Sequence, residues 1–136
     1  MKSEQKEVVA GILFRDGQVL ICQRRENDRF PLQWEFPGGK VKPDEDPEIA
    51  LEREMVEELA IDVKIDSKFI QYTYRYPDGP EILLRFYLIR EYVPEPLNRQ
   101  FRRIEWVPID ALGNYDFLEG DEQVINRLEH TFTHVS

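Results

Sequence analysis

One stretch of the chain, residues 35–61 (EFPGGKVKPDEDPEIALEREMVEELAI), restricts the possible folds more than any other. Glycine lacks a Cβ atom, so Gly38 and Gly39 predict a tight turn or a close approach of the backbone to a ligand. Asp46 and Pro47 suit the cap and the first turn of a helix. Apolar residues at helical spacing predict the buried side of this helix: Ile49, Val56 and Ala60, flanked by Met55 and Leu59.

The other side of the predicted helix carries three glutamates, Glu54, Glu57 and Glu58. Their spacing stacks them over adjacent turns, where like charges repel by about 0.2–0.5 kcal/mol per pair. Negative charge is also disfavoured in the C-terminal half of a helix, so stability alone would favour lysine here. Clustered carboxylate oxygens are the ligands that hard divalent cations prefer, Mg²⁺ above all. The spacing therefore fits a metal site, and equally a solvated acidic face.

The polar residues of this stretch also recur at fixed intervals. Gly39 is followed by five residues and Glu45, then by seven residues and Arg53-Glu54, and then by Met55, Glu57-Glu58, Ala60 and Ile61. This pattern resembles the Nudix box, and every fixed position matches except the last glycine, which is Ala60 here. The flanking Glu35-Phe36-Pro37 resembles the MutT-like branch of that family. The resemblance covers roughly residues 6–128, and the box at residues 39–61 is its most specific part.

The resemblance implies a reaction and a metal site. Nudix hydrolases cleave a nucleoside diphosphate linked to another group, and MutT-like members split nucleoside triphosphates into a nucleoside monophosphate and pyrophosphate. Carried over to this chain, the metal ligands are Glu54, Glu57 and Glu58 with the carbonyl of Gly38. The implied cofactor is Mg²⁺, for which Mn²⁺ could substitute. Arg53 would support catalysis by pairing with nearby carboxylates and holding them in place.

Two departures from the family pattern concern chemistry and stability. MutT-like relatives often carry a glutamate six residues before the tryptophan of a late strand, and counting back from Trp106 gives Gln100. An amide is a weaker metal ligand than a carboxylate and cannot act as a general base, so the base role falls to Glu54 or Glu57. Ala60 replaces the glycine that would end the helix in the left-handed conformation, which alanine adopts at a cost of about 1 kcal/mol.

Other residues are candidates for binding the nucleotide. By resemblance, Arg25 matches an arginine near the nucleotide, and Phe36 matches a residue that lines the base pocket. Trp34 and Tyr74 could stack on a base or belong to ordinary core packing. Asp121 stands where relatives carry Asn or Asp aimed at the base edge. Ionised, it would favour an exocyclic amino group such as that of cytosine; protonated, it could also pair with an oxidised guanine; or it only caps the following helix.

Composition narrows the class of partner. With 136 residues the chain is long enough for a core, and we expect one domain over residues 1–136. A net charge of −9 argues against binding duplex nucleic acid through phosphate contacts. No apolar run approaches the roughly 20 residues that cross a membrane, and the N-terminal residues lack a signal-peptide pattern. The single cysteine, Cys22, suits a reducing cytoplasm. These features fit a cytoplasmic monomer or homodimer with a small-molecule partner.

Periodicity and turn signals predict the remaining elements. Asp16-Gly17 and residues 77–80 predict turns between paired strands. The predicted strands are residues 7–14, 19–23, 33–36, 61–65, 67–76, 82–90 and 104–107, followed by a helical turn at 109–112, a helix at 120–129 with Val124, Ile125 and Leu128 facing inward, and a loose tail at 130–136. Helices among antiparallel hairpins predict an α+β domain. The resemblance implies an α/β/α sandwich around a central mixed sheet.

Three functions are compatible with these residues. The first is Mg²⁺-dependent hydrolysis of nucleoside triphosphates that clears unwanted nucleotides, such as 8-oxo-dGTP or a cytidine triphosphate. The second is a Nudix enzyme that cleaves another nucleoside diphosphate linkage, as in ADP-ribose or a dinucleoside polyphosphate. The third is a Nudix-like module that binds a nucleotide without cleaving it. The complete set of box glutamates argues against the third function, and only Gln100 argues for it.

Overall fold

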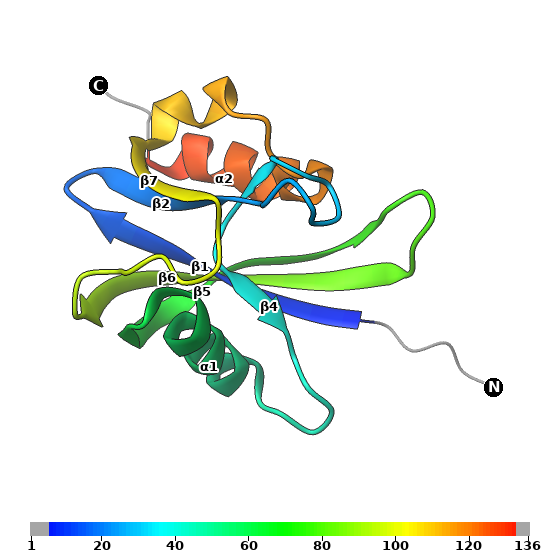
Figure 1. Cartoon of the computed structure of the whole chain (residues 1–136), viewed down its shortest axis with the longest axis horizontal. Helices are drawn as coiled ribbons and strands as arrows, with labels where there is room; N and C mark the ends of the chain where they lie inside the picture. Colours follow the sequence, from blue (N-terminus) through cyan, green and yellow to red (C-terminus); the bar gives the residue numbers. More distant parts are fainter. Residues whose placement is uncertain (1–5, 133–136) are drawn as a thin grey trace.

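The computed structural model describes residues 6–132 as a layered α+β structure (Figure 1). Its elements, in chain order, are β1 (Lys6–Arg15), β2 (Gln18–Gln23), β3 (Trp34–Glu35), β4 (Gly38–Lys40), α1 (Pro47–Leu59), β5 (Asp62–Arg75), β6 (Glu81–Val93), β7 (Arg103–Pro108), the 3-10 turns η1 (Ile109–Asn114) and η2 (Glu119–Asp121), and α2 (Glu122–Phe132). Neither α1 nor α2, the two α-helices of this region, has the length and apolar character needed to span a bilayer.

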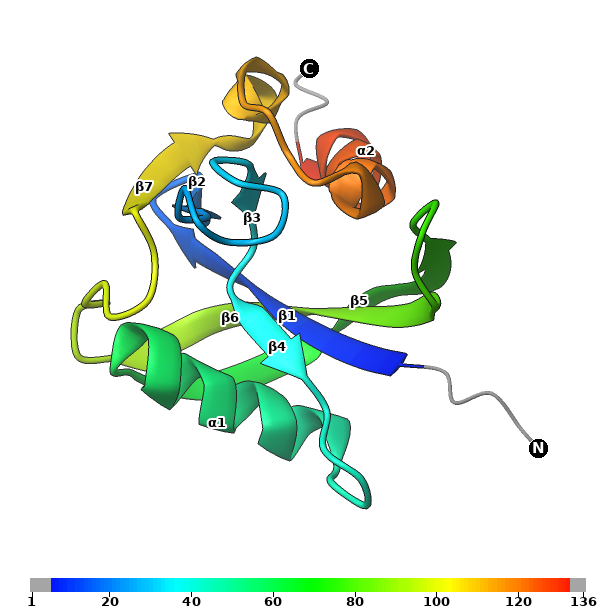
Figure 2. The same ribbon diagram turned by 45° about the vertical axis from the view of Figure 1, so that its right-hand side comes forward.

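The strands form one mixed sheet. Its order is β3-β2-β1-β6-β5, with β4 also paired to β1 and β7 to β2. β1 runs parallel to β6 and antiparallel to β4, while β5 and β6 pair antiparallel across the turn after β5. Helix α1 covers one face of the sheet and α2 the other (Figures 1 and 2). The expected α+β sandwich with a central mixed sheet is therefore confirmed.

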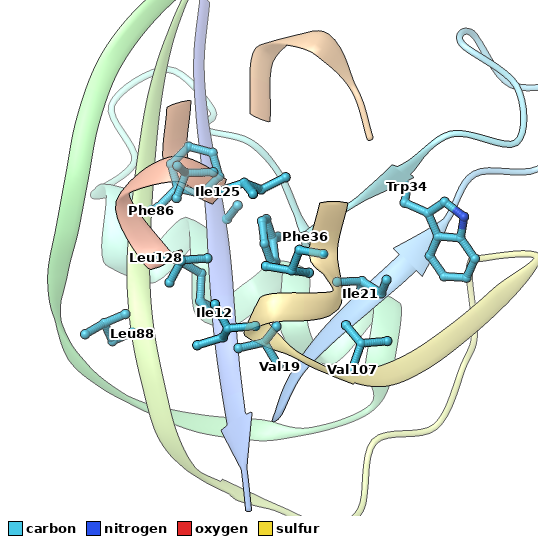
Figure 3. Packing of buried hydrophobic residues seen from close by; sticks show 14 of the residues in the cluster. Ile12, Val19, Ile21, Trp34, Phe36, Phe86, Leu88, Val107, Ile125 and Leu128 are labelled. Atoms are coloured by element: carbon cyan, nitrogen blue, oxygen red, sulfur yellow. The ribbon is translucent and has the colours of Figure 1, made fainter. Parts of the chain in front are cut away.

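Side chains of β1 alternate between two hydrophobic cores. Ala10 and Ile12 face the core under α2, whereas Val9 and Leu13 face the core under α1, as the two-residue period of a strand requires. Figure 3 shows the α2 side, where Ile125 and Leu128 lie near Phe86 and Ile12 of the sheet and near Phe36. The helix residues predicted to face inward are buried: Val124, Ile125 and Leu128.

The prediction for the buried face of α1 was wrong for Ile49 and Val56 and right for the flanking Met55 and Leu59. Ile49 and Val56 are 57% and 45% exposed, and the residues that pack on the sheet are Ala50, Leu51, Met55 and Leu59. Both apolar stripes have helical spacing, so periodicity alone did not distinguish them. The stripe that includes Leu51 and Met55 packs on the sheet, and this orientation of α1 sets how far each of its glutamates lies from the core.

Three other predictions about the elements need correction. Residues 61–65 and 67–76 form the single strand β5, whose pairing with β6 shifts register at three points between residues 64 and 70. The predicted loose tail at 130–136 was wrong for residues 130–132, which belong to α2, and residues 133–136 lie outside the described region. Gly38 and Gly39 lie in strand β4 and not in a tight turn.

Both ends of α1 follow from the local sequence. The carboxylate of Asp46 accepts hydrogen bonds from the backbone N–H groups of Glu48 (2.9 Å) and Ile49 (3.3 Å), and Pro47 occupies the first turn. At the other end Ala60 has φ 57° and ψ 41°, the left-handed conformation that glycine favours. The helix therefore ends as a glycine cap would end it, at a cost in backbone strain.

Replacing Ala60 with glycine should raise the free energy of unfolding by about 1 kcal/mol, because glycine has no Cβ atom that would clash in the left-handed conformation. For a chain of this size we expect the melting temperature to rise by about 4 °C. Glu52→Gly, at an exposed interior position of the same helix, is the control and should lower stability by about 1 kcal/mol. An Ala60→Gly variant less stable than wild type would contradict this account.

Candidate active site

The two glycines of β4 allow three elements to approach closely. A Cβ atom on Gly38 would lie 2.0 Å from the carbonyl oxygen of Val9, and one on Gly39 would lie 2.3 Å from Oε2 of Glu54. β4 pairs with β1 at these positions. The glycines are thus needed for the close approach of β1 and of the Glu54 carboxylate, whereas the sequence predicted a tight turn or a close approach to a ligand.

Arg53 organises the acidic residues around α1. Its guanidinium binds both carboxylate oxygens of Glu45 at 2.9 Å, Oε2 of Glu54 at 3.0 Å and the carbonyl oxygen of Lys40 at 3.1 Å. The hydrogen bonds from Arg53, and then that from the Lys42 backbone N–H, lower the pKa of Glu45 to about 2. Arg53 therefore ties the loop before α1 to the helix and fixes the orientation of Glu54.

Glu54 and Glu58 are one turn apart and partly buried at the edge of the α1 core. Glu58 accepts a hydrogen bond from the Gly38 backbone N–H at 3.1 Å. Burial, followed by the negative charges of Glu54 and Glu35, raises the pKa of Glu58 to about 9. Burial also raises the pKa of Glu54, against the opposing effect of Arg53. Two carboxyl groups are thus crowded together with too little positive charge beside them.

Glu57 differs from its two neighbours in exposure. Its side chain is 56% exposed, and its nearest cationic atom is Nη1 of Arg53 at 3.5 Å. Among residues 6–132, no three His, Cys, Asp or Glu side chains converge closely enough to hold a metal ion. The crowded, hydrogen-bonded carboxyls of Glu54 and Glu58 are nevertheless the oxygen donors that a hard divalent cation prefers.

A cavity of about 360 Å³ runs beside β4. Its lining includes Gly38, Gly39 and Glu58 from the acidic region, and Phe36 and Asp121 from the predicted base pocket. The structure therefore brings together residues that lie up to 113 positions apart in the sequence, from residue 8 to residue 121. A volume of this order suits a small ligand.

Asp121 is buried at this cavity, with only 6% of its surface exposed. Burial, followed by the charge of Glu35, raises its pKa well above the ordinary value of 3.8, although a hydrogen bond from the Phe36 backbone N–H opposes the shift. Burial therefore favours the protonated, neutral form of this carboxyl group. Such a group offers both a hydrogen-bond donor and an acceptor, which was the protonated alternative in the sequence analysis.

Several residues that line the cavity were not predicted from the sequence to belong to the site. Glu35 and Arg24 form an ion pair at 3.2 Å within it. Burial raises the pKa of Glu35 to about 6, and the Arg24 guanidinium opposes that shift. Phe30 and Tyr76 also line it, with ring centroids 4.9 Å apart. A charged residue between the apolar Trp34 and Phe36 was the one signal that could have identified Glu35.

Three predicted nucleotide-binding residues lie outside the cavity lining. Trp34 is 7% exposed and packs edge-on against Tyr115. The hydroxyl of Tyr74 donates to the Glu119 carboxylate. Arg25 borders a neighbouring hollow, where its Nε donates to the Gln100 carbonyl oxygen at 2.8 Å. Trp34 therefore belongs to the core, which was the alternative to base stacking. Arg25 does not line the cavity itself, but it contacts Gln100, which does.

Comparison with known proteins agrees with this geometry. The chain is 37% identical over 123 residues to the 8-oxo-dGTP diphosphatase of Haemophilus influenzae, covering 90% of each chain. It is 52% identical over 60 residues to the CTP pyrophosphohydrolase of Escherichia coli, covering 43% of this chain and 44% of that protein. The solution structure of the E. coli ORF135 protein is similar with a TM-score of 0.83 at 27% identity, over 98% of this chain and 96% of that one. The NUDIX domain model matches residues 5–128, and the chain therefore belongs to the Nudix family.

Proposed function

We propose that this protein is a Mg²⁺-dependent nucleoside triphosphate pyrophosphohydrolase that removes unwanted nucleotides, acting on 8-oxo-dGTP or on a cytidine triphosphate. The observation that carries the proposal is the single cavity lined both by Glu58 and Gly38 and by Phe36 and Asp121. The relatives named 8-oxo-dGTP diphosphatase and CTP pyrophosphohydrolase support the same class of substrate. Nudix hydrolases generally require a divalent metal, and the choice of Mg²⁺ follows from the all-oxygen donor set.

Glu54, Glu57, Glu58 and the carbonyl of Gly38 would hold the metal. A bound Mg²⁺ would neutralise phosphate oxygens and lower the pKa of the attacking water. Water attacks one phosphorus of the triphosphate, its proton passes to Glu54 or Glu57, and the bond to the pyrophosphate leaving group breaks. Arg53 keeps Glu54 in position through the contact of 3.0 Å. In this proposal the catalytic residues belong to one domain, and the enzyme works in the cytoplasm.

The other end of the cavity would hold the base. In its protonated form the carboxyl of Asp121 can donate one hydrogen bond and accept another, so it can pair with any base edge that presents an adjacent acceptor and donor. Cytosine and 8-oxoguanine both present such an edge, as do the other common bases. Phe36 lies in the same lining and provides an apolar surface for the ring. The pairing is therefore compatible with both proposed bases, and the preference for them rests on the relatives named 8-oxo-dGTP diphosphatase and CTP pyrophosphohydrolase.

The decisive experiment measures pyrophosphate and phosphate release from a panel of nucleotides in Mg²⁺, in Mn²⁺ and in EDTA. The panel contains the common ribo- and deoxyribonucleoside triphosphates, 8-oxo-dGTP, 5-methyl-dCTP and ADP-ribose. We expect metal-dependent pyrophosphate release from 8-oxo-dGTP or from a cytidine triphosphate. Cleavage of ADP-ribose alone would favour the second function named above. Nucleotide binding without turnover would favour a binding module.

Gln100 provides a separate prediction. The loop that carries it is tied to α1, because the Arg99 backbone N–H donates to the Glu58 carbonyl oxygen at 3.0 Å, and Gln100 lines the cavity. Gln100→Glu should add a carboxylate beside Glu58 and raise kcat/KM about tenfold, with half-maximal activity at a lower Mg²⁺ concentration. Gln71→Glu, on the exposed part of β5, adds the same charge elsewhere and should change neither. Equal effects of both changes would refute a role for position 100.

A further inference from the structure

Three tyrosines at the end of β5 hold the segment that carries Asp121. Tyr72 and Tyr74 alternate along the strand and share one of its faces, and Tyr76 directly follows its last residue. Their hydroxyls bond to η2 and the start of α2: Tyr72 to the Gly120 carbonyl (2.7 Å) and the Val124 N–H (3.3 Å), Tyr74 to the Glu119 carboxylate, and Tyr76 to the Gly120 N–H (3.2 Å). The approach is close, since a Cβ atom on Gly120 would lie 2.8 Å from the Tyr76 hydroxyl.

The Tyr72 hydroxyl occupies a position inside the helical ladder. In a regular α-helix the Val124 N–H would donate to the carbonyl of Gly120, four residues earlier. Here the Tyr72 hydroxyl accepts from that N–H and donates to that carbonyl. A side chain inserted in this way takes the place of the regular bond in the ladder. Residues 119–121 form a 3-10 turn, which is tighter than an α-helical turn, and α2 begins only at Glu122.

Tyr72 is well placed to keep this bridge. Its ring stacks on Phe86, with centroids 5.7 Å apart, and lies against the α2 core. Burial, followed by the nearby Asp121, raises the pKa of the Tyr72 hydroxyl well above its usual range. The hydroxyl therefore keeps its proton and can donate and accept at the same time.

We propose that Tyr72 is a positioning residue for base recognition: its hydroxyl, inserted between the Gly120 carbonyl and the Val124 N–H, holds residues 119–121 in the 3-10 turn from which Asp121 lines the cavity. Without the hydroxyl, Val124 would bond directly to Gly120, and the change from a 3-10 to an α-helical turn would reorient Asp121 relative to the cavity. The consequence for substrate rests on the proposed function. The position of the Asp121 carboxyl does not depend on that function.

Tyr72→Phe tests this proposal, because it removes the hydroxyl and keeps the ring. We expect KM for the preferred nucleotide to rise about tenfold with kcat changed less than twofold, since one oriented hydrogen-bonding group is lost from binding and the acidic region is untouched. Tyr92→Phe is the matched control. Its hydroxyl donates to the Phe14 carbonyl oxygen at 3.1 Å and its ring stacks on Trp106, far from Asp121 in the fold. The control should leave KM unchanged.

A structural measurement separates this proposal from the proposed function. In NMR spectra of the metal-free protein, Tyr72→Phe should shift the amide resonances of Gly120 and Val124 and the carboxyl ¹³C resonance of Asp121, whereas Tyr92→Phe should not. Unchanged resonances, or an unchanged KM in an active enzyme, would overturn the positioning role. A wild-type protein that cleaves no nucleotide would remove the proposed function, and the carboxyl resonance of Asp121 would still decide what Tyr72 does.

Discussion

Replacing Glu57 with glutamine is expected to lower kcat/KM by at least about 100-fold while leaving the fold intact. Outer groups that only support metal ligands already cost 10–100-fold when they are changed, and a ligand itself should cost more. The side chain is 56% exposed and has no contact with the core, so its replacement leaves no buried group unpaired. Turnover of the preferred nucleotide and thermal unfolding, measured on the same samples, test both parts of the prediction.

Glu52→Gln provides the matched control for this change. Glu52 is exposed on the same helix, five positions earlier, and lies outside the spaced pattern of the box. The control removes one negative charge from α1 and should change kcat/KM less than twofold. If Glu57→Gln retained metal-dependent activity close to that of the control, the metal would have to be held by Glu54, Glu58 and other oxygen atoms, and Glu57 would lose its assigned role.

Asp121→Asn is expected to become progressively more stable than wild type as the pH rises. The unfolded chain loses the Asp121 proton near its ordinary pKa of 3.8, whereas burial keeps the folded chain protonated to much higher pH. Between these two pKa values the unfolded state binds fewer protons, so the stability of wild type falls by up to about 1.4 kcal/mol per pH unit. Asparagine carries no such proton and does not contribute this loss.

Urea unfolding of both proteins in EDTA, at intervals from pH 4 to pH 8, measures this difference. Comparison with the variant cancels the contributions of Glu35 and Glu58, which also have raised pKa values but are present in both proteins. A stability difference that stays constant across this range would show that Asp121 is ionised in the folded state.

The same variant also tests base recognition. A protonated carboxyl and an amide have the same complement of one acceptor and at least one donor. The order of preference among 8-oxo-dGTP and the cytidine nucleotides should therefore be the same in Asp121→Asn as in wild type at pH 7. An inverted order would show that the carboxyl is ionised when the nucleotide is bound.

Much of the site could be predicted from the sequence because its signals are local. The intervals from Gly39 to Ile61 identified the family, and Asp46 with Pro47 identified the start of α1, since capping depends on a few neighbouring residues. The left-handed Ala60 also follows from the box pattern. The alternation of apolar residues along β1 and the inward face of α2 likewise follow from periods within a single element.

The tertiary structure determined the features that depend on which faces of the helices and the sheet pack together. Two stripes of α1 had suitable spacing, and packing buried Leu51 in place of Ile49. That choice placed Glu58 at the edge of the core and left Glu57 in solvent, although both are glutamates of the same box. A pKa depends on burial and on charges brought close by folding, which no local pattern records.

The base end of the cavity shows the same division. The sequence by itself determined the family, the layered α+β class, the helix boundaries set by caps and the set of acidic residues, because these depend on local spacing and composition. Only the tertiary structure determined that burial raises the pKa of Asp121, that Trp34 packs in the core and that Tyr72 bonds to the turn beside Asp121. Each of these results from contacts between residues distant in the chain, whose geometry exists only once the sheet and both helices have packed together.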